Sequence, residues 1–209
     1  MKKNKKNYLK YKIFLAGYPK REITLKILTY IFSRIKTSLF YRFFKIGANS
    51  FIDHRAVIDG SNFISIGSNC FIHRNAWLAV PLFEAQNTIP FKTLDIYNSV
   101  RVDPGCTISA AQGIKIEDDV LIGPNVTILD HIHKYTNSNE PISRQGIKIK
   151  GTIIIKKGAW LCANSTIIPQ KGLLIIGKNS IVGANTFLNK SLPDFSIAVG
   201  TPARIISQK

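Results

Sequence analysis

The feature that most constrains this chain is a six-residue repeat that begins at Ile46 and continues almost to the end of its 209 residues. Each unit opens with an aliphatic residue, and its fifth position is small or β-branched. The clearest run has openers at Ile116, Ile122 and Ile128, with Val120 and Val126 at the fifth positions. A unit this short cannot bury its apolar face alone, so it must stack on its neighbours. The repeat therefore predicts a solenoid.

The units group in threes, and this grouping predicts the shape of each coil. The openers Ile46 and Ile66 lie 20 residues apart, and Ile155 and Ile176 lie 21 apart. Three six-residue sides and a short corner insertion make one triangular coil, whose strands stack on the same sides of the next coil. The pattern predicts a mainly β prism of about six coils, with the opening aliphatic residues inside.

Two segments interrupt the repeat. Residues 79–95 follow the second predicted coil, and residues 130–152 follow the fourth. Such excursions leave a stacked core intact, and loops on a rigid scaffold often carry function. The second segment holds two of the four histidines, His131 and His133, so we expect the chemistry there. The sequence therefore divides into an arm at 1–45 and a repeat domain at 46–209.

The arm at 1–45 is strongly basic. It holds 13 of the 29 Lys and Arg residues and one acid, Glu22, so it contributes +12 of the formal net charge of +17. Apolar residues recur at helical spacing over 23–44, which predicts one amphipathic helix or two short ones. The apolar face packs on the rest of the protein, lies among the headgroups of an anionic membrane, or does both. Nucleic acid is disfavoured, because the aromatic residues of the arm fall on its apolar face.

Three cysteines bear on the cellular compartment. Cys70, Cys106 and Cys162 are widely spaced and odd in number, which fits neither a disulfide framework nor a CxxC metal site. A reducing cytoplasm is the compartment in which such thiols persist. The segment Met1–Lys12 does not read as a cleavable signal peptide, and no apolar run approaches the roughly 20 residues of a membrane span. We expect a cytoplasmic protein, with peripheral contact at the inner face of a membrane through the arm.

The repeat resembles the hexapeptide-repeat acyltransferases in three stretches, which read IGPNVTIL, GAWLCANSTIIPQ and IVGANTFLNKSLPDFSIAVGTPARII. The resemblance covers residues 46–209 and is closest to sugar O-acetyltransferases, such as galactoside, maltose and capsular-polysaccharide acetyltransferases. It implies a left-handed parallel β-helix that assembles as a homotrimer. The left hand comes from the resemblance alone, because most parallel crossovers are right-handed.

The resemblance also implies a catalytic histidine. It places His133, five residues after the opener Ile128, as the general base that takes the proton of a sugar hydroxyl. An imidazole is largely neutral yet still basic near neutral pH, which suits this role. His131 is the rival base. Asp103 replaces the asparagine of the family and either orients the imidazole or binds a sugar hydroxyl, while Asp130 either orients a histidine or only starts the loop.

The co-substrate implied by the resemblance is acetyl-CoA, and the family's contacts fall on residues that the chain supplies. These are Trp160, Ala163, Ala184, Asn189, Lys190 and Arg204. Small residues at the two alanine positions leave room for the pantetheine arm, and Arg204 with Lys190 would meet phosphate charge. Asn189 departs from the threonine of the family.

The resemblance therefore implies an acetyl-CoA-dependent O-acetyltransferase that acts on a carbohydrate hydroxyl in cell-surface polysaccharide biosynthesis. Two alternatives stay open, an N-acetyltransferase of an amino sugar or nucleotide-linked sugar, and a non-catalytic β-helix scaffold with a membrane-binding arm. Retention of His133, Trp160 and Arg204 argues against the scaffold. No metal site is expected, because His54 and His73 hold different positions in their units and do not stack in register.

Overall fold

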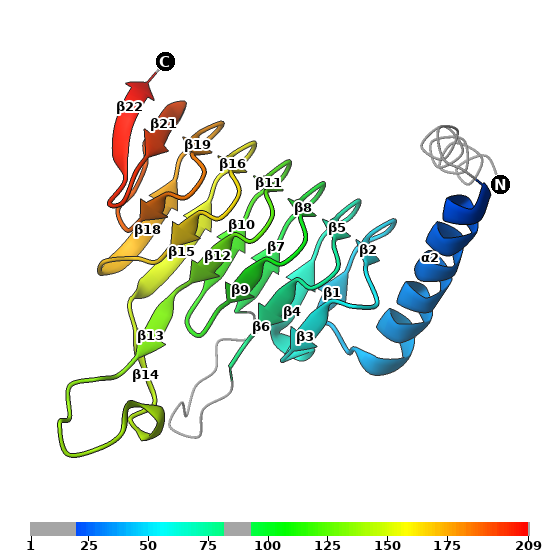
Figure 1. Ribbon diagram of the computed structural model, residues 1–209, viewed down its shortest axis with the longest axis horizontal. Helices are drawn as coiled ribbons and strands as arrows, with labels where there is room; N and C mark the ends of the chain where they lie inside the picture. The colour runs from blue at the N-terminus through cyan, green and yellow to red at the C-terminus, as the bar shows by residue number, and fades with distance from the viewer. Residues whose placement is uncertain (1–19, 82–92, 209) are drawn as a thin grey trace.

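The computed structural model describes residues 20–81 and 93–208, which form a left-handed parallel β-helix with one α-helix at its N-terminal end (Figure 1). The first 19 residues of the predicted arm and residues 82–92 of the first predicted loop lie outside the described residues. The predicted fold class is confirmed.

Three sheets form the sides of the prism, and successive strands of a sheet lie one coil apart. The first sheet contains β1 (Lys45–Ile46), β4 (Ile64–Ile66), β7 (Leu94–Ile96), β10 (Ile114–Ile116), β15 (Gly151–Ile155) and β18 (Gly172–Ile176). The second contains β2 (Phe51–Ile52), β5 (Phe71–Ile72), β8 (Arg101–Val102), β11 (Leu121–Ile122), β16 (Trp160–Leu161), β19 (Ile181–Val182), β21 (Ser196–Val199) and β22 (Arg204–Gln208). The third contains β3 (Val57–Asp59), β6 (Trp77–Ala79), β9 (Thr107–Ser109), β12 (Thr127–Leu129), β17 (Thr166–Ile167) and β20 (Phe187–Leu188), and the short 3-10 helix η1 (Ser61–Phe63) precedes β4.

Most strands are short, because each side of a coil usually has two or three paired residues; β15 and β18 are longer and pair over five. Neighbouring strands are parallel and in register, so that Ile72 pairs with Val102 and Leu121 with Trp160. The exception is the last pair, β21 and β22, which is antiparallel and ends the second sheet. Six complete coils stack in this way, as the spacing of the units predicts.

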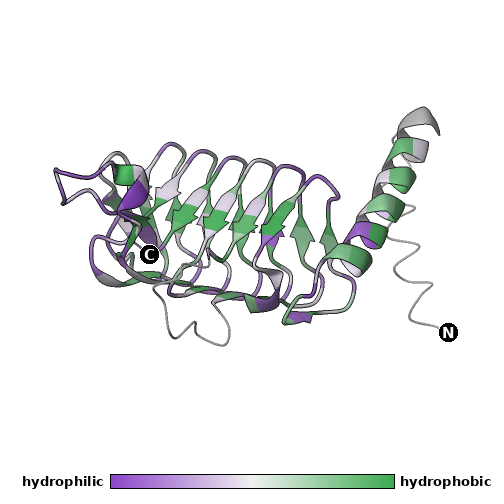
Figure 2. Ribbon diagram, turned by 90° about the horizontal axis from the view of Figure 1, so that it is seen from below, coloured by the Kyte–Doolittle hydropathy of each residue, from purple (hydrophilic) through white to green (hydrophobic). Residues whose placement is uncertain are grey.

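The core is a continuous column of the opening aliphatic residues. From Ile52 to Val182 the openers of the second sheet are all buried. Figure 2 shows hydrophobic residues concentrated on the strands and hydrophilic residues on the corner turns. Burial of this apolar surface is the main term that stabilises the prism.

The corners explain why the fifth position is small. The residue just before it commonly has a positive φ, as at Asn69, Asn125 and Asn164, and asparagine tolerates that backbone conformation better than most residues. The following side chain then points inward where the corner is tight. Cys70 and Cys106 occupy such positions and are buried free thiols that pack in the core. Burial raises the pKa of the Cys106 thiol to about 11.

The N-terminal helix is a single element, α2 (Lys20–Phe40), which ends four residues before the predicted boundary. It ends there because the chain turns to place Tyr41 and Phe43 against the core at the open end of the first coil. Among the described residues, no helix has the length and apolar character that crossing a membrane would require. Most apolar side chains of α2 are exposed, although the Tyr30 ring stacks on Phe51 with ring centroids 5.7 Å apart, so the apolar residues of the helix pack on the prism only in part.

Gly151 at the start of β15 makes the closest backbone contact in the stack. Its φ is +154°, and a Cβ there would lie 1.5 Å from the carbonyl oxygen of Gly172 in the next coil. We expect Gly151→Ala to lower the free energy of unfolding by about 3 kcal/mol, because backbone rather than a flexible side chain must move. Urea unfolding measures the change. Gly146→Asn is the control, since Gly146 has open space around it and asparagine tolerates its φ of +74°; equal losses in both variants would contradict the packing argument.

Candidate active site

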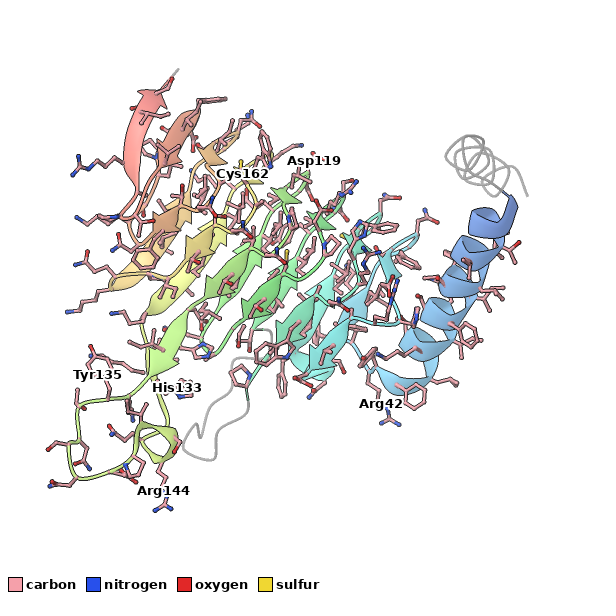
Figure 3. The ribbon with its side chains drawn as sticks, in the orientation of Figure 1. Arg42, Asp119, His133, Tyr135, Arg144 and Cys162 are labelled. Atoms are coloured by element: carbon pink, nitrogen blue, oxygen red, sulfur yellow. The ribbon has the colours of Figure 1, made fainter. Side chains whose placement is uncertain are left out.

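The histidine loop is an antiparallel hairpin that projects from the prism between the fourth and fifth coils (Figures 1 and 3). Its elements are β13 (His131–His133), η2 (Ile142–Arg144) and β14 (Ile147–Ile149). The register places His131 opposite Ile149 and His133 opposite Ile147. Alternate residues of a strand share a face, so the two histidines lie on the same side. We call residues 130–150 the histidine hairpin.

Asp130 roots this hairpin in the prism. Its carboxylate is fully buried and accepts hydrogen bonds from the backbone N–H groups of Ala111, Gln112 and Gly113, each at 2.8 Å. Its backbone carbonyl accepts from Lys150 N at 2.8 Å and Gly151 N at 3.2 Å, where the hairpin returns. One residue therefore ties both ends of the hairpin to the preceding coil, and its burial is compensated by hydrogen bonds.

The two histidines have different environments. His131 Nδ1 lies 2.8 Å from Asp130 Oδ1, and only 12% of the His131 side chain is exposed. His133 is exposed, and within the described part of the chain no hydrogen bond to its ring is present. The carboxylate thus fixes the orientation of the His131 ring, whereas the His133 ring can meet a ligand or a neighbouring molecule.

Asp103 lies on a different edge of the prism, in the turn that follows β8. Its Oδ1 is 2.7 Å from Arg101 Nε and 3.6 Å from His73 Nε2. Within the single chain its described partners are these two side chains rather than His131 or His133. The expectation that Asp103 orients the catalytic imidazole of its own chain therefore receives no support from the geometry.

His73 forms a cluster with Arg101 and Asp103, and the sequence analysis assigned no role to it. Asp53, His73 and Asp103 all occupy the second position of their units in three successive coils, so they stack along one corner. Their shared position in the repeat is the sequence signal from which this stacking could have been predicted. Burial lowers the pKa of His73, and Arg101 lowers it further against the opposing effect of Asp103. A neutral imidazole beside a carboxylate can donate and accept hydrogen bonds with a polar ligand.

The corner that carries Asp103 continues towards the C-terminus, and we call it the second corner, made of the turns that follow the strands of the second sheet. Ala163 and Ala184 stack there in consecutive coils, where Asn185 N donates to Ala163 O at 3.0 Å. Thr201 Oγ1 donates to Asn185 O at 3.2 Å, so the turn before Arg204 extends the same corner. Trp160 is half-exposed on the strand that leads into it. The structure thus brings four of the predicted acetyl-CoA contacts, Trp160, Ala163, Ala184 and Arg204, to one side of the prism.

The other two predicted contacts lie elsewhere. Asn189 and Lys190 follow β20 of the third sheet, on the edge from which the histidine hairpin leaves two coils earlier. Figure 3 shows the separation, since His133 lies at the hairpin and Cys162 marks the second corner. The predicted site residues of one chain therefore occupy two edges of the prism.

Over residues 20–81 and 93–208, no group of three or more His, Cys, Asp or Glu side chains is placed to hold a metal ion. The polar groups at both edges are instead engaged with one another or directed to solvent.

Comparison with known proteins identifies relatives among acetyltransferases. The chain is 29% identical over 143 residues to galactoside O-acetyltransferase of Lactococcus lactis, which is 68% of this chain and 62% of the relative. It is 30% identical over 117 residues to the Escherichia coli K12 protein named "Putative lipopolysaccharide biosynthesis O-acetyl transferase WbbJ", covering 53% and 58% of the two chains. The matched segment thus spans about three fifths of the length of each relative.

A third relative transfers to nitrogen. A dTDP-3-amino-3,6-dideoxy-alpha-D-galactopyranose 3-N-acetyltransferase of Aneurinibacillus thermoaerophilus is 44% identical over 55 residues, which is 26% of this chain and 27% of that protein. No family model matches the chain.

Among solved structures, a point mutant of AntD, an N-acyltransferase from Bacillus cereus in complex with dTDP and coenzyme A, superposes with a TM-score of 0.67. The match is 24% identical and covers 84% of this chain and 88% of AntD, which establishes the shared fold. The chain is therefore similar to the hexapeptide-repeat acyltransferases and has their left-handed parallel β-helix fold.

Proposed function

We propose that the protein transfers acetyl from acetyl-CoA to a carbohydrate hydroxyl in the biosynthesis of cell-surface polysaccharide, with His133 as general base. The observation that carries the proposal is the histidine hairpin, an exposed imidazole on a rigid insertion held by the buried carboxylate of Asp130. Similarity to galactoside and lipopolysaccharide O-acetyltransferases supports the carbohydrate acceptor. The three free cysteines fit a reducing cytoplasm as the compartment.

In the proposed reaction, a ring nitrogen of His133 takes the proton of the acceptor hydroxyl as that oxygen attacks the thioester carbonyl. The new C–O bond forms, the C–S bond breaks, and the imidazolium returns its proton to the thiolate of coenzyme A. His133 is favoured over His131 because a general base must reach the acceptor, and the His131 ring is largely covered and bonded to Asp130. His131 instead helps to hold the hairpin.

The second corner is the proposed surface for acetyl-CoA. Ala163 and Ala184 leave the corner without bulky side chains over two coils, so a thin pantetheine chain can lie along it. Trp160 offers an exposed ring beside this path, and the exposed guanidinium of Arg204 can meet phosphate charge. Asn189 and Lys190 lie on the other edge, so they would have to act from a neighbouring copy.

Asp103 is proposed to bind the acceptor. Both of its ion-pair contacts end on Oδ1, which leaves Oδ2 available to accept a hydrogen bond from a sugar hydroxyl. The neighbouring His73 can form a second hydrogen bond to the same sugar. The polar cluster of Arg101, His73 and Asp103 thus supplies the kind of side chains that a carbohydrate requires.

We further propose a homotrimer, because the site is incomplete on one chain. The histidine hairpin and the second corner lie on different edges of the prism. When identical prisms pack side by side around a threefold axis, the hairpin of one copy can meet the second corner of the next. Each trimer would then hold three shared sites.

Mixed trimers test this arrangement. We expect His133→Ala and Ala184→Trp to be inactive alone, since the first removes the base and the second fills an exposed position of the second corner. In trimers mixed in equal amounts, about a quarter of the neighbouring pairs combine an intact hairpin with an intact corner. Rates of acetyl transfer measured before and after mixing should therefore rise to about a quarter of the unmodified rate. Mixed trimers that stay inactive would place the whole site on one chain.

The activity itself is tested by incubating the protein with labelled acetyl-CoA and a panel of glycans, followed by NMR to locate the acetyl group. Acetyl esters on sugar hydroxyls are the expected product. Amides on amino sugars would establish the N-acetyltransferase alternative, which the nitrogen-transferring relative favours over 55 residues. Absence of any transfer across hydroxyl and amine acceptors would leave the scaffold alternative and overturn the proposal.

A further inference from the structure

The helix α2 packs on the prism through a polar face. Thr29, Ser33 and Lys36 share one side of the helix, and Ser33 is fully buried. Ser33 Oγ accepts a hydrogen bond from His54 N at 2.8 Å. Lys36 Nζ donates to the carbonyl oxygens of His54 and Ala56 at 2.7 and 3.0 Å. These bonds fix which side of the helix faces the β-helix.

The rest of the α2 surface carries an apolar face that is largely exposed, although the Phe32 ring also lies 6.4 Å from the ring of His54. This face consists of Leu25, Leu28, Ile31, Phe32, Ile35 and Leu39, which are between 45 and 72% exposed. Figures 1 and 2 show α2 standing outside the first coil, at the end of the prism opposite the C-terminus. This orientation is the reverse of an ordinary surface helix, which turns its apolar stripe towards the core. An apolar patch of this kind marks an interaction surface.

A cleft next to this face combines apolar and cationic groups. It has a volume of about 1150 Å³ and lies between the second half of α2 and the first coil. Ile35, Leu39 and Ile46 contribute apolar walls, while Arg34 and Arg42 contribute guanidinium groups. Such a site suits a molecule that has both an acyl chain and an anionic headgroup.

The charge of the arm indicates the partner. Residues 1–45 hold 13 basic residues and one acid, a net charge of +12. A second copy of the helix is the alternative partner. Apolar residues recur at an alternating spacing of three and four, as in a coiled-coil seam, at Leu25, Leu28, Phe32, Ile35 and Leu39. Bringing copies together there would concentrate like charges, whereas an anionic lipid surface neutralises them. The exposed Ile31 also widens the apolar face beyond that narrow seam.

We propose that α2 docks on an anionic membrane, with its apolar face among the acyl chains and the guanidinium groups of Arg34 and Arg42 at the phosphates. The helix lies along the surface, and the prism remains outside the bilayer. The proposal concerns binding only, so it stands or fails independently of the acetyl-transfer reaction.

The test is sedimentation of the full chain with vesicles of phosphatidylcholine, with and without phosphatidylglycerol. We expect binding at least about tenfold tighter to the phosphatidylglycerol vesicles, because basic residues gain energy near anionic lipid. High salt should weaken that binding through screening. Equal binding to both kinds of vesicle, or binding to neither, would overturn the proposal.

Two matched double variants distinguish membrane binding by the apolar face of α2 from nonspecific binding by any exposed apolar residue. Leu28→Ser/Ile35→Ser should weaken binding by about tenfold or more, because two side chains no longer enter the acyl region. Leu173→Ser/Ile206→Ser removes residues of similar exposure on the prism and should leave binding unchanged. Equal effects of the two variants would contradict the assignment. Light scattering of both variants tests whether a second copy of the chain is the partner instead. If the α2 variant alone loses self-association while its vesicle binding is unchanged, the apolar face binds a second copy.

Discussion

Replacing His133 by alanine is expected to lower kcat by about 10²–10⁴-fold, the usual scale for loss of a general base. The affinity for acetyl-CoA should barely change, because the proposed contacts with the co-substrate come from Trp160, Arg204 and the small residues of the second corner and not from the imidazole. Initial rates at saturating acetyl-CoA measure the first effect, and calorimetric titration with coenzyme A measures the second. A large loss of coenzyme A affinity would mean that His133 binds the co-substrate rather than the acceptor proton.

The control is His131→Asn, which keeps a donor group near Asp130 while it removes the imidazole. We expect its rate to fall by less than about tenfold, because that ring holds the hairpin and does not reach the acceptor. An inactive His131→Asn beside a nearly normal His133→Ala would transfer the catalytic role to His131. Nearly normal rates in both variants would remove the histidine mechanism altogether.

The second large effect is expected at Asp130, where alanine should lower the free energy of unfolding by about 3 kcal/mol. The substitution leaves three backbone N–H groups, at Ala111, Gln112 and Gly113, without their acceptor in a buried place. Denaturant unfolding measures the loss of stability. Hydrogen exchange should show faster exchange at these three amides and a loosened hairpin, and the rate of acetyl transfer should fall with it.

Asp103→Ala is the matched control for that prediction. Its contacts join one partly exposed carboxylate to the side chains of Arg101 and His73, so its loss should cost less than about 1 kcal/mol. Its effect should instead fall on the KM for the acceptor. If Asp130→Ala were as stable as Asp103→Ala, the buried carboxylate would not be what roots the hairpin.

The coil architecture could be predicted from the sequence because the repeat encodes it directly. An aliphatic opener every six residues and a small residue four places later report which side chains point inward, and Ile72, Val102 and Ile122 stack as that spacing requires. The positions of the two insertions followed from breaks in the same pattern. The hand of the helix could not be derived in this way, because spacing is the same for both hands, and it came from resemblance to a family.

The orientation of α2 shows where a periodic pattern stops being informative. Helical spacing groups Leu28, Ile31 and Ile35 on one face, and the structure confirms that grouping. Which face turns inward depends on contacts with distant residues. The hydrogen bonds of Ser33 and Lys36 to the turn at His54 determine which face turns inward, and no local sequence pattern predicts these bonds.

The candidate site was only partly predictable for a similar reason. The small residues Ala163 and Ala184 and the neighbouring Trp160 fall on one corner because their units are consecutive. The buried role of Asp130 depends on the amides of the preceding coil, and the contact of His73 with Asp103 depends on stacking across coils. Both are visible only when residues about 20 or 30 positions apart are placed side by side.

The stack of coils also sets the distance along the prism between α2 and the histidine hairpin. Strands that pair along a sheet are about 4.8 Å apart, and the hairpin leaves the fourth coil while α2 lies against the first, so the two are separated by roughly 14 Å along the prism. With α2 on a membrane and the prism axis perpendicular to it, this spacing sets the height above the lipid headgroups of the coil from which the histidine hairpin leaves. An acceptor attached to lipid would have to extend to that height, and gaining or losing one coil would move it by one strand spacing. The number of repeats ahead of the hairpin would then select acceptors by length, independently of the chemistry at the site.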